Sequence, residues 1–113
     1  MAVTVRGSDI LFPDGSTQTK AETCSQAQAG WCKLASGIII QWNISQYISD
    51  YQVKTETFPI AFPSACTSVV TQNVDSQDQS WMDNMRVYNL TTTGFTMYRR
   101  GDNSRVWYIA IGY

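Results

Sequence analysis

The last eight residues, Val106–Tyr113, constrain the fold more than any other stretch of the chain. They predict a strand with two apolar faces, in which Trp107, Ile109, Ile111 and Tyr113 alternate with Val106, Tyr108 and Ala110. A strand that is apolar on both faces must be covered on both, by a second sheet, by a neighbouring subunit, or by one of each. We expect the Trp107 face to pack on the chain's own core with Trp42. The Tyr108 face should meet a second sheet or a sister chain.

Short strands separated by turn signals account for most of the remaining chain. In the stretch 38–44, Ile38, Ile40, Trp42 and Ile44 share one face and predict a half-buried strand with that face in the core. Further strands are predicted over 8–12, 51–57, 67–74, 85–90, 95–99 and 105–113, with turns at 13–16, 91–94 and 100–104. Residues 58–63 should form an extended crossover that plugs the core, because each proline removes a ladder donor. The pattern predicts an all-β fold, an antiparallel β-sandwich or barrel-like domain.

The N-terminal quarter of the chain differs in character from the rest. Residues 1–29 are predicted to be a short extended neck that connects to a shaft, and residues 30–113 to be the β-sandwich tip. The stretch 17–29 is polar and could hold a short helix from Lys20 to Gln26, but no wide apolar stripe supports that helix. Such a segment is either a linker or is wrapped against identical copies of itself.

Cysteine usage and charge limit the chemistry that the chain can perform. Cys24, Cys32 and Cys66 form no C-x-x-C pair, and we interpret them as free thiols of a protein made in a reducing cytoplasm without a signal peptide. Spacing alone also permits a Cys24–Cys32 bridge. The chain has no histidine, which removes the commonest general base and metal ligand. We therefore expect no metal and no cofactor, and a net charge of -1 gives no reason to propose a nucleic acid partner.

The polar stretch 75–84 holds the first candidate binding residues. Trp81 either folds back onto the core or serves as a platform for a sugar ring, with Asp83 and Asn84 taking the hydroxyl groups. Asp75, Asp78 and Asp83 would also supply the paired carboxylates of a glycosidase. A solvated loop explains them more simply, because 113 residues leave little room for a long substrate groove. We expect no enzymatic activity and no catalytic residue.

Two further groups of candidates lie in other loops, where binding residues are commonly held by a rigid sheet. Tyr47, together with Tyr51, offers a second aromatic patch. The turn near residue 102 crowds donors and acceptors at a loop tip: Arg99, Arg100, Asp102, Asn103 and Arg105. Of these, we expect Tyr47, Arg100, Asp102 and Asn103 to contact a receptor.

Five stretches together resemble the C-terminal tip domain of phage and prophage tail fibres, the gp53-like C-terminal domain family. They are Ile10–Thr19 (ILFPDGSTQT), Gly30–Trp42 (GWCKLASGIIIQW), Phe58–Cys66 (FPIAFPSAC), Thr91–Phe95 (TTTGF) and Tyr108–Tyr113 (YIAIGY). The resemblance covers nearly the whole chain. It implies a homotrimeric β-structure at the far end of a longer fibre, but residues 44–57 and 75–84 match no motif, so it supplies no receptor residues.

What the resemblance implies is non-covalent adhesion of a fibre tip to a bacterial surface, through a saccharide such as lipopolysaccharide or through an outer-membrane protein. The location would be the virion, and the other partners would be the fibre shaft and a fibre-assembly chaperone. Two other functions remain open from the sequence. One is a structural trimerisation cap that touches no receptor, and the other is an enzyme that trims the receptor.

Overall fold

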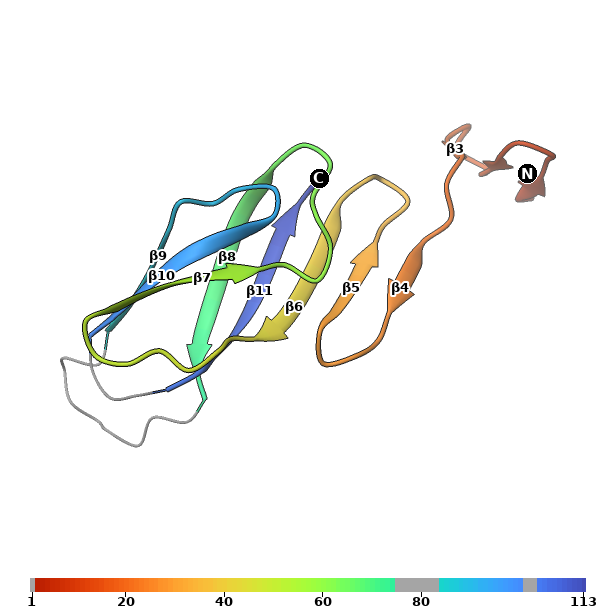
Figure 1. Cartoon of the computed structure of the whole chain (residues 1–113). Helices are drawn as coiled ribbons and strands as arrows, with labels where there is room; N and C mark the ends of the chain where they lie inside the picture. Colours follow the sequence, from red (N-terminus) through yellow and green to blue (C-terminus); the bar gives the residue numbers. More distant parts are fainter. Residues whose placement is uncertain (1, 75–83, 101–103) are drawn as a thin grey trace.

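The computed structural model describes residues 2–74, 84–100 and 104–113, and these form eleven strands in three antiparallel sheets (Figure 1). The strands are β1 (Thr4–Val5), β2 (Ile10–Leu11), β3 (Thr17–Gln18), β4 (Thr23–Ser25), β5 (Gly30–Lys33), β6 (Ile39–Ile44), β7 (Gln52–Thr57), β8 (Cys66–Asn73), β9 (Asn84–Tyr88), β10 (Gly94–Arg100) and β11 (Val106–Gly112). The predicted all-β fold is confirmed. No described residue is helical, so no helix in this part of the chain could cross a membrane. The helix considered at Lys20–Gln26 is wrong, because β4 lies there.

Two sheets face each other to form the sandwich. The five-stranded sheet has the order β4-β5-β6-β11-β8, and the three-stranded sheet has the order β7-β10-β9. Aromatic rings fill the space between them, since the Phe95 and Tyr108 ring centroids are 4.9 Å apart and those of Phe58 and Phe95 are 5.7 Å apart. Phe58 and Phe62 reach this core from the 58–63 crossover, as predicted, with 5% and 2% of their surface exposed.

The C-terminal strand lies in the middle of the five-stranded sheet, between β6 and β8 (Figure 1). Its residues alternate between buried and exposed along its whole length, which confirms the two predicted faces. The face with Val106, Tyr108 and Ala110 is at most 1% exposed and meets the second sheet. The expectation that the Trp107 face packs on the chain's own core is wrong, because Trp107 is 40% exposed and Ile109 is 49% exposed.

The neighbouring strand β6 is likewise turned the opposite way from the predicted orientation. Gln41 is fully buried between the sheets, whereas Ile38 is 42% exposed and Trp42 is only half-buried on the outer side. The polar side chain is tolerated inside because its amide group is paired. Its Nε2 donates to the carbonyl of Ile60 at 2.9 Å, and its Oε1 accepts from the Ile60 amide at 3.0 Å. These two bonds satisfy buried polar groups and hold the crossover against β6.

The end of the chain is also held by backbone hydrogen bonds. The amide of Tyr113 donates to the carbonyl of Ala65 at 2.9 Å, and the amides of Ser64 and Ala65 donate to the carbonyl of Tyr113 at 2.8 and 2.7 Å. Most chain ends fray unless such contacts fix them. The C-terminal strand therefore closes the sandwich by pairing with the end of the 58–65 connection.

The neck carries its own small sheet, β1-β2-β3, which stands apart from the sandwich at one end of a chain that measures 58 × 24 × 22 Å (Figure 1). Its predicted turn is present, because the amide of Gly15 donates to the Phe12 carbonyl at 3.0 Å. An ion pair between Arg6 and Asp9 braces the neighbouring turn, and the arginine lowers the pKa of that aspartate. β4 lies in the segment assigned to the neck, yet it hydrogen-bonds to β5 and so extends the five-stranded sheet.

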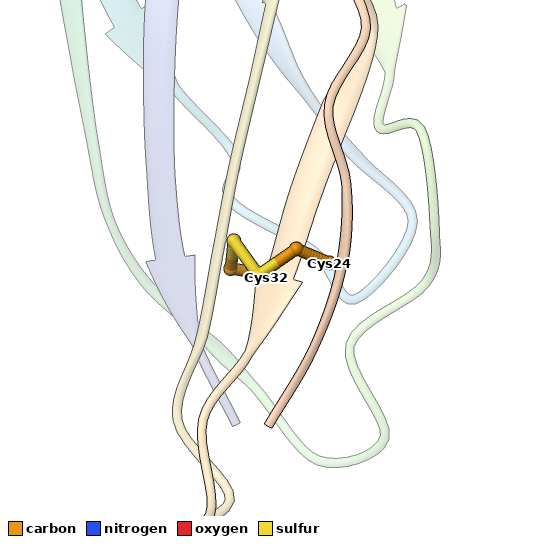
Figure 2. The surroundings of a disulfide bond; sticks show 2 residues. All are labelled: Cys24 and Cys32. Atoms are coloured by element: carbon orange, nitrogen blue, oxygen red, sulfur yellow. A yellow bond between two sulfur atoms is a disulfide. The ribbon is translucent and has the colours of Figure 1, made fainter. Parts of the chain in front are cut away.

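The interpretation of all three cysteines as free thiols is wrong. Cys24 and Cys32 form a disulfide between β4 and β5, where they sit directly opposite each other with Cα atoms 4.1 Å apart (Figure 2). Cys66 is the free cysteine, and burial raises the pKa of its thiol. β4 spans three residues at the sheet edge and contributes no residue to the buried core. The disulfide therefore fixes β4, and with it the end of the neck, to β5 of the sandwich. Packing of apolar side chains does not hold β4 in place, because none of its residues is in the core.

Candidate functional site

The end of the sandwich that lies away from the neck holds the 45–51 connection between β6 and β7, the end of β8, the start of β9, the end of β10 and the start of β11 (Figure 1). The chain also has a connection from β8 to β9 and one from β10 to β11. Residues 75–83 and 101–103 of these connections lie outside the described residues. The opposite end of the sandwich holds the C-terminus, and the neck joins the sandwich at the start of the edge strand β4. We call the end away from the neck the distal end.

The connection 45–51 is bonded to residues 104–106 on one side and to Arg99 of β10 on the other. Ile48 and Ser104 form a two-bond bridge, with N–O distances of 3.0 and 3.2 Å, and both residues are fully buried. On one side of this bridge, the Ser45 amide donates to the Val106 carbonyl at 2.8 Å. On the other side, the Tyr51 amide donates to the Arg99 carbonyl at 2.8 Å. The loop is therefore anchored to the sandwich along its whole length.

This alignment places a tyrosine beside an arginine twice. The Arg105 guanidinium lies 4.8 Å from the ring centroid of Tyr47, and the Arg100 guanidinium lies 5.3 Å from that of Tyr51. Both distances are within the range of a cation–π contact. The tyrosines remain open to solvent, since Tyr47 is 52% and Tyr51 is 60% exposed. We call these four residues the Tyr–Arg site.

The backbone of Tyr51 adopts a conformation that tyrosine rarely takes. Its φ is 59°, in the left-handed region that usually requires glycine or asparagine. The hydrogen bonds on either side hold it there, because the Gln52 amide donates to the Ser49 carbonyl at 3.1 Å and the Tyr51 amide donates to Arg99. Residues kept in such conformations are concentrated at ligand-binding sites.

The structure joins two groups of residues that the sequence left separate. Tyr47 had been grouped with Tyr51, and Arg100 with Arg105, but nothing in the sequence connected a tyrosine to an arginine about fifty residues away. Asn84 begins β9, and its backbone is paired with that of Arg100. The other four candidates lie outside the described residues: Trp81, Asp83, Asp102 and Asn103.

Arg99 does not belong to the exposed site. Its side chain is fully buried beneath the distal end, and its Nη1 donates to the Asn73 side-chain oxygen at 2.9 Å. This bond joins the ends of β10 and β8. Arg99 is therefore part of the support of the distal end, whereas Arg100 is exposed.

A second surface feature is an apolar face on the five-stranded sheet. Ile109 of β11 lies directly opposite Trp42 of β6 and Val70 of β8, and the latter is 65% exposed. Directly opposed residues in antiparallel strands share a face of the sheet. We call this surface the outer face and define it by its apolar members Ile40, Trp42, Ile44, Val70, Trp107, Ile109 and Ile111. Ser68 and Gln72 of β8 stand on the same face, opposite Ile111 and Trp107. None of these residues is charged, and a largely apolar surface of this kind marks an interaction site.

The acidic residues of the described part of the chain do not gather into a metal site. The described residues contain no group of three or more cysteine, aspartate or glutamate side chains that could hold a metal ion. The buried carboxylate of Glu56 accepts a hydrogen bond from the Gln46 amide at 2.8 Å, which supports the start of the 45–51 connection. The three carboxylates considered for a glycosidase all lie outside the described residues: Asp75, Asp78 and Asp83.

Tyr108 provides a test of the core beneath the site. Among the described residues, its hydroxyl is the buried side-chain atom without a hydrogen-bond partner. Burial raises the pKa of Tyr108 to about 12, and the nearby Glu56 carboxylate adds to the rise. The Asn43 side chain opposes the rise by its proximity but lies outside hydrogen-bond geometry.

Tyr108→Phe is expected to keep the stability of the protein at neutral pH and to reduce its loss of stability in alkali. Between the unfolded pKa of about 10 and the folded value, the unfolded chain is ionised and the folded chain is not, so stability falls as the pH rises. Urea unfolding at pH 7, 10 and 12 measures the free energy of unfolding. Equal pH profiles for the two proteins would show that Tyr108 does not cause the alkaline loss.

Comparisons with known proteins point to one family. The family model described as "Putative tail fiber protein gp53-like, C-terminal" matches residues 33–113. The chain is similar to the solved structure of the N-truncated R1-type pyocin tail fibre, with 28% identity and a TM-score of 0.71. The match covers 83% of this chain and 87% of the R1 chain. The chain also shares its fold with a C-terminal part of the R2 pyocin fibre of P. aeruginosa, with 21% identity and a TM-score of 0.76. That match covers 83% of this chain and 26% of the R2 chain. The comparison with curated proteins found no match.

Proposed function

The chain belongs to the gp53-like C-terminal family of tail fibre proteins, and we propose that it is the receptor-binding tip of a fibre on a phage or a phage-like particle. The tip would adhere without covalent chemistry to a saccharide of the bacterial surface, such as lipopolysaccharide. The observation that carries this proposal is the exposed Tyr–Arg site at the distal end. If the neck continues into a shaft, this end faces away from the particle and toward the cell.

The chemistry of the distal end suits a saccharide. Exposed tyrosine rings offer flat apolar faces for the C–H side of a sugar ring, and their hydroxyl groups can exchange hydrogen bonds with sugar hydroxyls. Tyr47 and Tyr51 stand on a hydrogen-bonded loop, so little conformational freedom would be lost on binding. Single sites of this size bind weakly, and several copies at one tip would add avidity.

We propose that the fibre tip is a homotrimer whose copies meet through the outer face. The outer face lies on β6, β8 and β11, three strands of six to eight residues, so it spans roughly 24 Å by roughly 14 Å and covers roughly 340 Å² before side-chain relief is added. A stable complex buries about 800 Å² on each partner, so contacts of the neck would have to add to those of the outer face. A second copy fits this surface better than a saccharide does, because the face is apolar and its members are uncharged. An intertwined neck from residues 1–29 would then lead into the shaft, and the 30–113 segment would form the tip.

The proposal predicts that the double variant Tyr47→Ala, Tyr51→Ala binds host cells at least about tenfold more weakly than the intact chain, because each substitution removes a stacking face. Adsorption to a panel of Gram-negative strains measures the effect. Tyr88→Ala is the matched control. Tyr88 is an exposed tyrosine too, at 37%, and it lies beside Arg86, but it belongs to β9 and not to the Tyr–Arg site. Equal binding by both variants would remove the tyrosines from the site. Absence of binding by the intact chain would contradict adhesion itself.

The outer face also supports a second function, that of a trimerisation cap that touches no receptor. Exchanging the segment 44–57, which holds the 45–51 connection and β7, and separately the segment 75–84, with those of a relative of different host range distinguishes the two functions. A changed host range indicates receptor binding, and an unchanged one indicates the cap. We also propose that the tip cleaves nothing, so incubation with host polysaccharide should release no new reducing ends.

A further inference from the structure

The Cys24–Cys32 disulfide lies where the neck joins the sandwich. It connects β4, the edge strand of the five-stranded sheet, to β5, and the pairing of these two strands covers three residue pairs. Two of the three residues of β4 are exposed, and none belongs to the buried core. Because the ladder is short and the core contributes nothing here, the disulfide is the strongest link between β4 and the rest of the sheet.

The balance between a docked and a released β4 depends on this bond. A three-residue ladder has few hydrogen bonds, and each contributes little net stability, because water replaces it when the strand leaves the sheet. On release, β4 and the turn that leads to β5 would also regain conformational entropy. The bond limits that gain, because it keeps Cys24 beside Cys32 whether or not the ladder is formed.

The sandwich itself does not depend on β4. On its other side β5 is paired with β6 over residues 30–33, and Gly30 and Ile39 of these pairs are buried. The buried core is supplied by residues between Ile39 and Ala110, all of which lie after both cysteines of the bridge in the chain. Loss of the bond should therefore release β4 and the neck without unfolding the sandwich.

Trp42 connects the turn between β4 and β5 to the outer face. Its indole Nε1 donates to the Ala27 carbonyl at 3.0 Å. The ring also lies against the backbone of Gly30, where a Cβ atom would come within 2.5 Å of a ring carbon. Trp42 belongs to the outer face, so release of β4 and its turn would remove a support of one of the larger side chains of that face.

We propose that the Cys24–Cys32 bond is a redox-controlled lock between the neck and the sandwich. In the oxidised chain, β4 is docked on β5 and the neck enters the sheet at a fixed position. In the reduced chain, β4 leaves the edge of the sheet, and the neck is joined to β5 by an unpaired segment.

The lock closes by thiol–disulfide exchange with a small-molecule disulfide. The thiolate of one cysteine attacks a sulfur of the small disulfide, which releases the first small thiol and leaves a mixed disulfide. The thiolate of the other cysteine then forms the Cys24–Cys32 bond and displaces the second small thiol. The two cysteine sulfurs are thereby oxidised, and the small disulfide is reduced to two thiols that take up the two protons.

The consequence of the lock for assembly rests on the proposed trimer. Release of β4 would free the necks of the copies and loosen Trp42 on the outer face, so the reduced chain should form a weaker trimer. Thiols stay reduced in the cytoplasm, whereas disulfides persist outside the cell. A phage-like particle assembled in a cytoplasm would therefore lock its fibre tips after it leaves the producing cell.

Hydrogen exchange followed by mass spectrometry tests the lock on the intact chain, treated either with oxidised glutathione or with dithiothreitol. We expect the amides of β4 to exchange at least about tenfold faster in the reduced chain, and those of β10 to exchange at the same rate in both. The double variant Cys24→Ser, Cys32→Ser should behave as the reduced chain in both treatments. Cys66→Ser is the matched control, because it removes the free cysteine and should respond to dithiothreitol as the intact chain does.

Three results would overturn the lock. The first is equal exchange of β4 in the oxidised and the reduced chain. The second is faster exchange of β10 together with β4, because the bond would then stabilise the whole sandwich rather than one strand. The third is a chain that still has three free thiols after incubation with oxidised glutathione.

Light scattering over a dilution series tests the link to assembly. Reduction should raise the concentration at which the proposed trimer dissociates by about tenfold or more. An unchanged dissociation concentration would overturn that link. An oxidised chain that is monomeric at every concentration would contradict the proposed trimer but not the lock, which the exchange measurement decides by itself.

Discussion

Ile109→Asp is expected to convert the proposed trimer into folded monomers. Ile109 lies on the central strand of the outer face, opposite Trp42 and Val70, and is 49% exposed in the single chain. In the monomer an aspartate there would be solvated and harmless. In the proposed trimer it would be buried at an apolar interface without a partner, which costs several kcal/mol for each copy.

Light scattering of the purified protein measures the oligomeric state, and far-UV circular dichroism reports whether the strands remain. We expect monomers with the β-sheet spectrum retained, and loss of cell adsorption through loss of avidity. Val53→Asp is the matched control, because Val53 is 55% exposed on β7, in the other sheet, and should leave the trimer intact. An Ile109→Asp protein that remains trimeric with unchanged stability would show that the copies do not meet through the outer face. Val70→Asp, on the edge strand β8, provides a second test of the same face.

Gly112→Ala is expected to destabilise the folded chain by about 3 kcal/mol or more, the range of severe core defects. A Cβ atom at this position would overlap the carbonyl oxygen of Ala65 and lie 2.7 Å from the Phe62 ring. The Ala65 carbonyl cannot move away freely, because it accepts the hydrogen bond from Tyr113 that closes the sandwich. Relief of the overlap would therefore break the pairing of the C-terminal strand.

Thermal and urea unfolding of Gly112→Ala measure this cost. The control is Gly7→Ala in the neck, where a Cβ atom would meet nothing within 4 Å, so we expect little change. Removal of residues 111–113 would delete all the hydrogen bonds between Tyr113 and residues 64–65, and should abolish both folding and formation of the proposed trimer. Soluble trimer from the shortened chain, or an unchanged unfolding midpoint for Gly112→Ala, would show that this end is dispensable.

Local patterns in the sequence were sufficient for the strands and turns. The alternation in Val106–Tyr113 and in 38–44 reflects the two-residue repeat of a strand, and this repeat does not depend on what covers each face. The predicted strands 51–57, 67–74 and 95–99 are present as β7, β8 and β10, and no bound differs by more than one residue. The turn at 91–94 follows from its own chemistry, since the Thr91 hydroxyl accepts from the Gly94 amide at 3.1 Å.

The side of the sheet that faces the core was decided by the tertiary structure alone. In β6 and β11 the bulkier apolar set faces outward, and Gln41 faces inward. A periodic pattern shows that two faces differ, but where both faces are apolar, as in Val106–Tyr113, the pattern does not show which of them turns inward. The choice depends on contacts such as those of Gln41 with the Ile60 backbone, nineteen residues away.

The disulfide and the Tyr–Arg site depended on tertiary structure in the same way. Cys32 follows Cys24 at a sequence separation of 8. This spacing permits a bridge only if β4 and β5 pair in the register that places the two cysteines side by side. Tyr47 and Arg105 meet because the Ile48–Ser104 bridge aligns their two segments. The sequence by itself determined the β-fold, its strands and its resemblance to the tail fibre family, because these follow from local repeats and motif order. Register and the inward face required the folded chain, because they are set by pairing between segments that are distant in sequence.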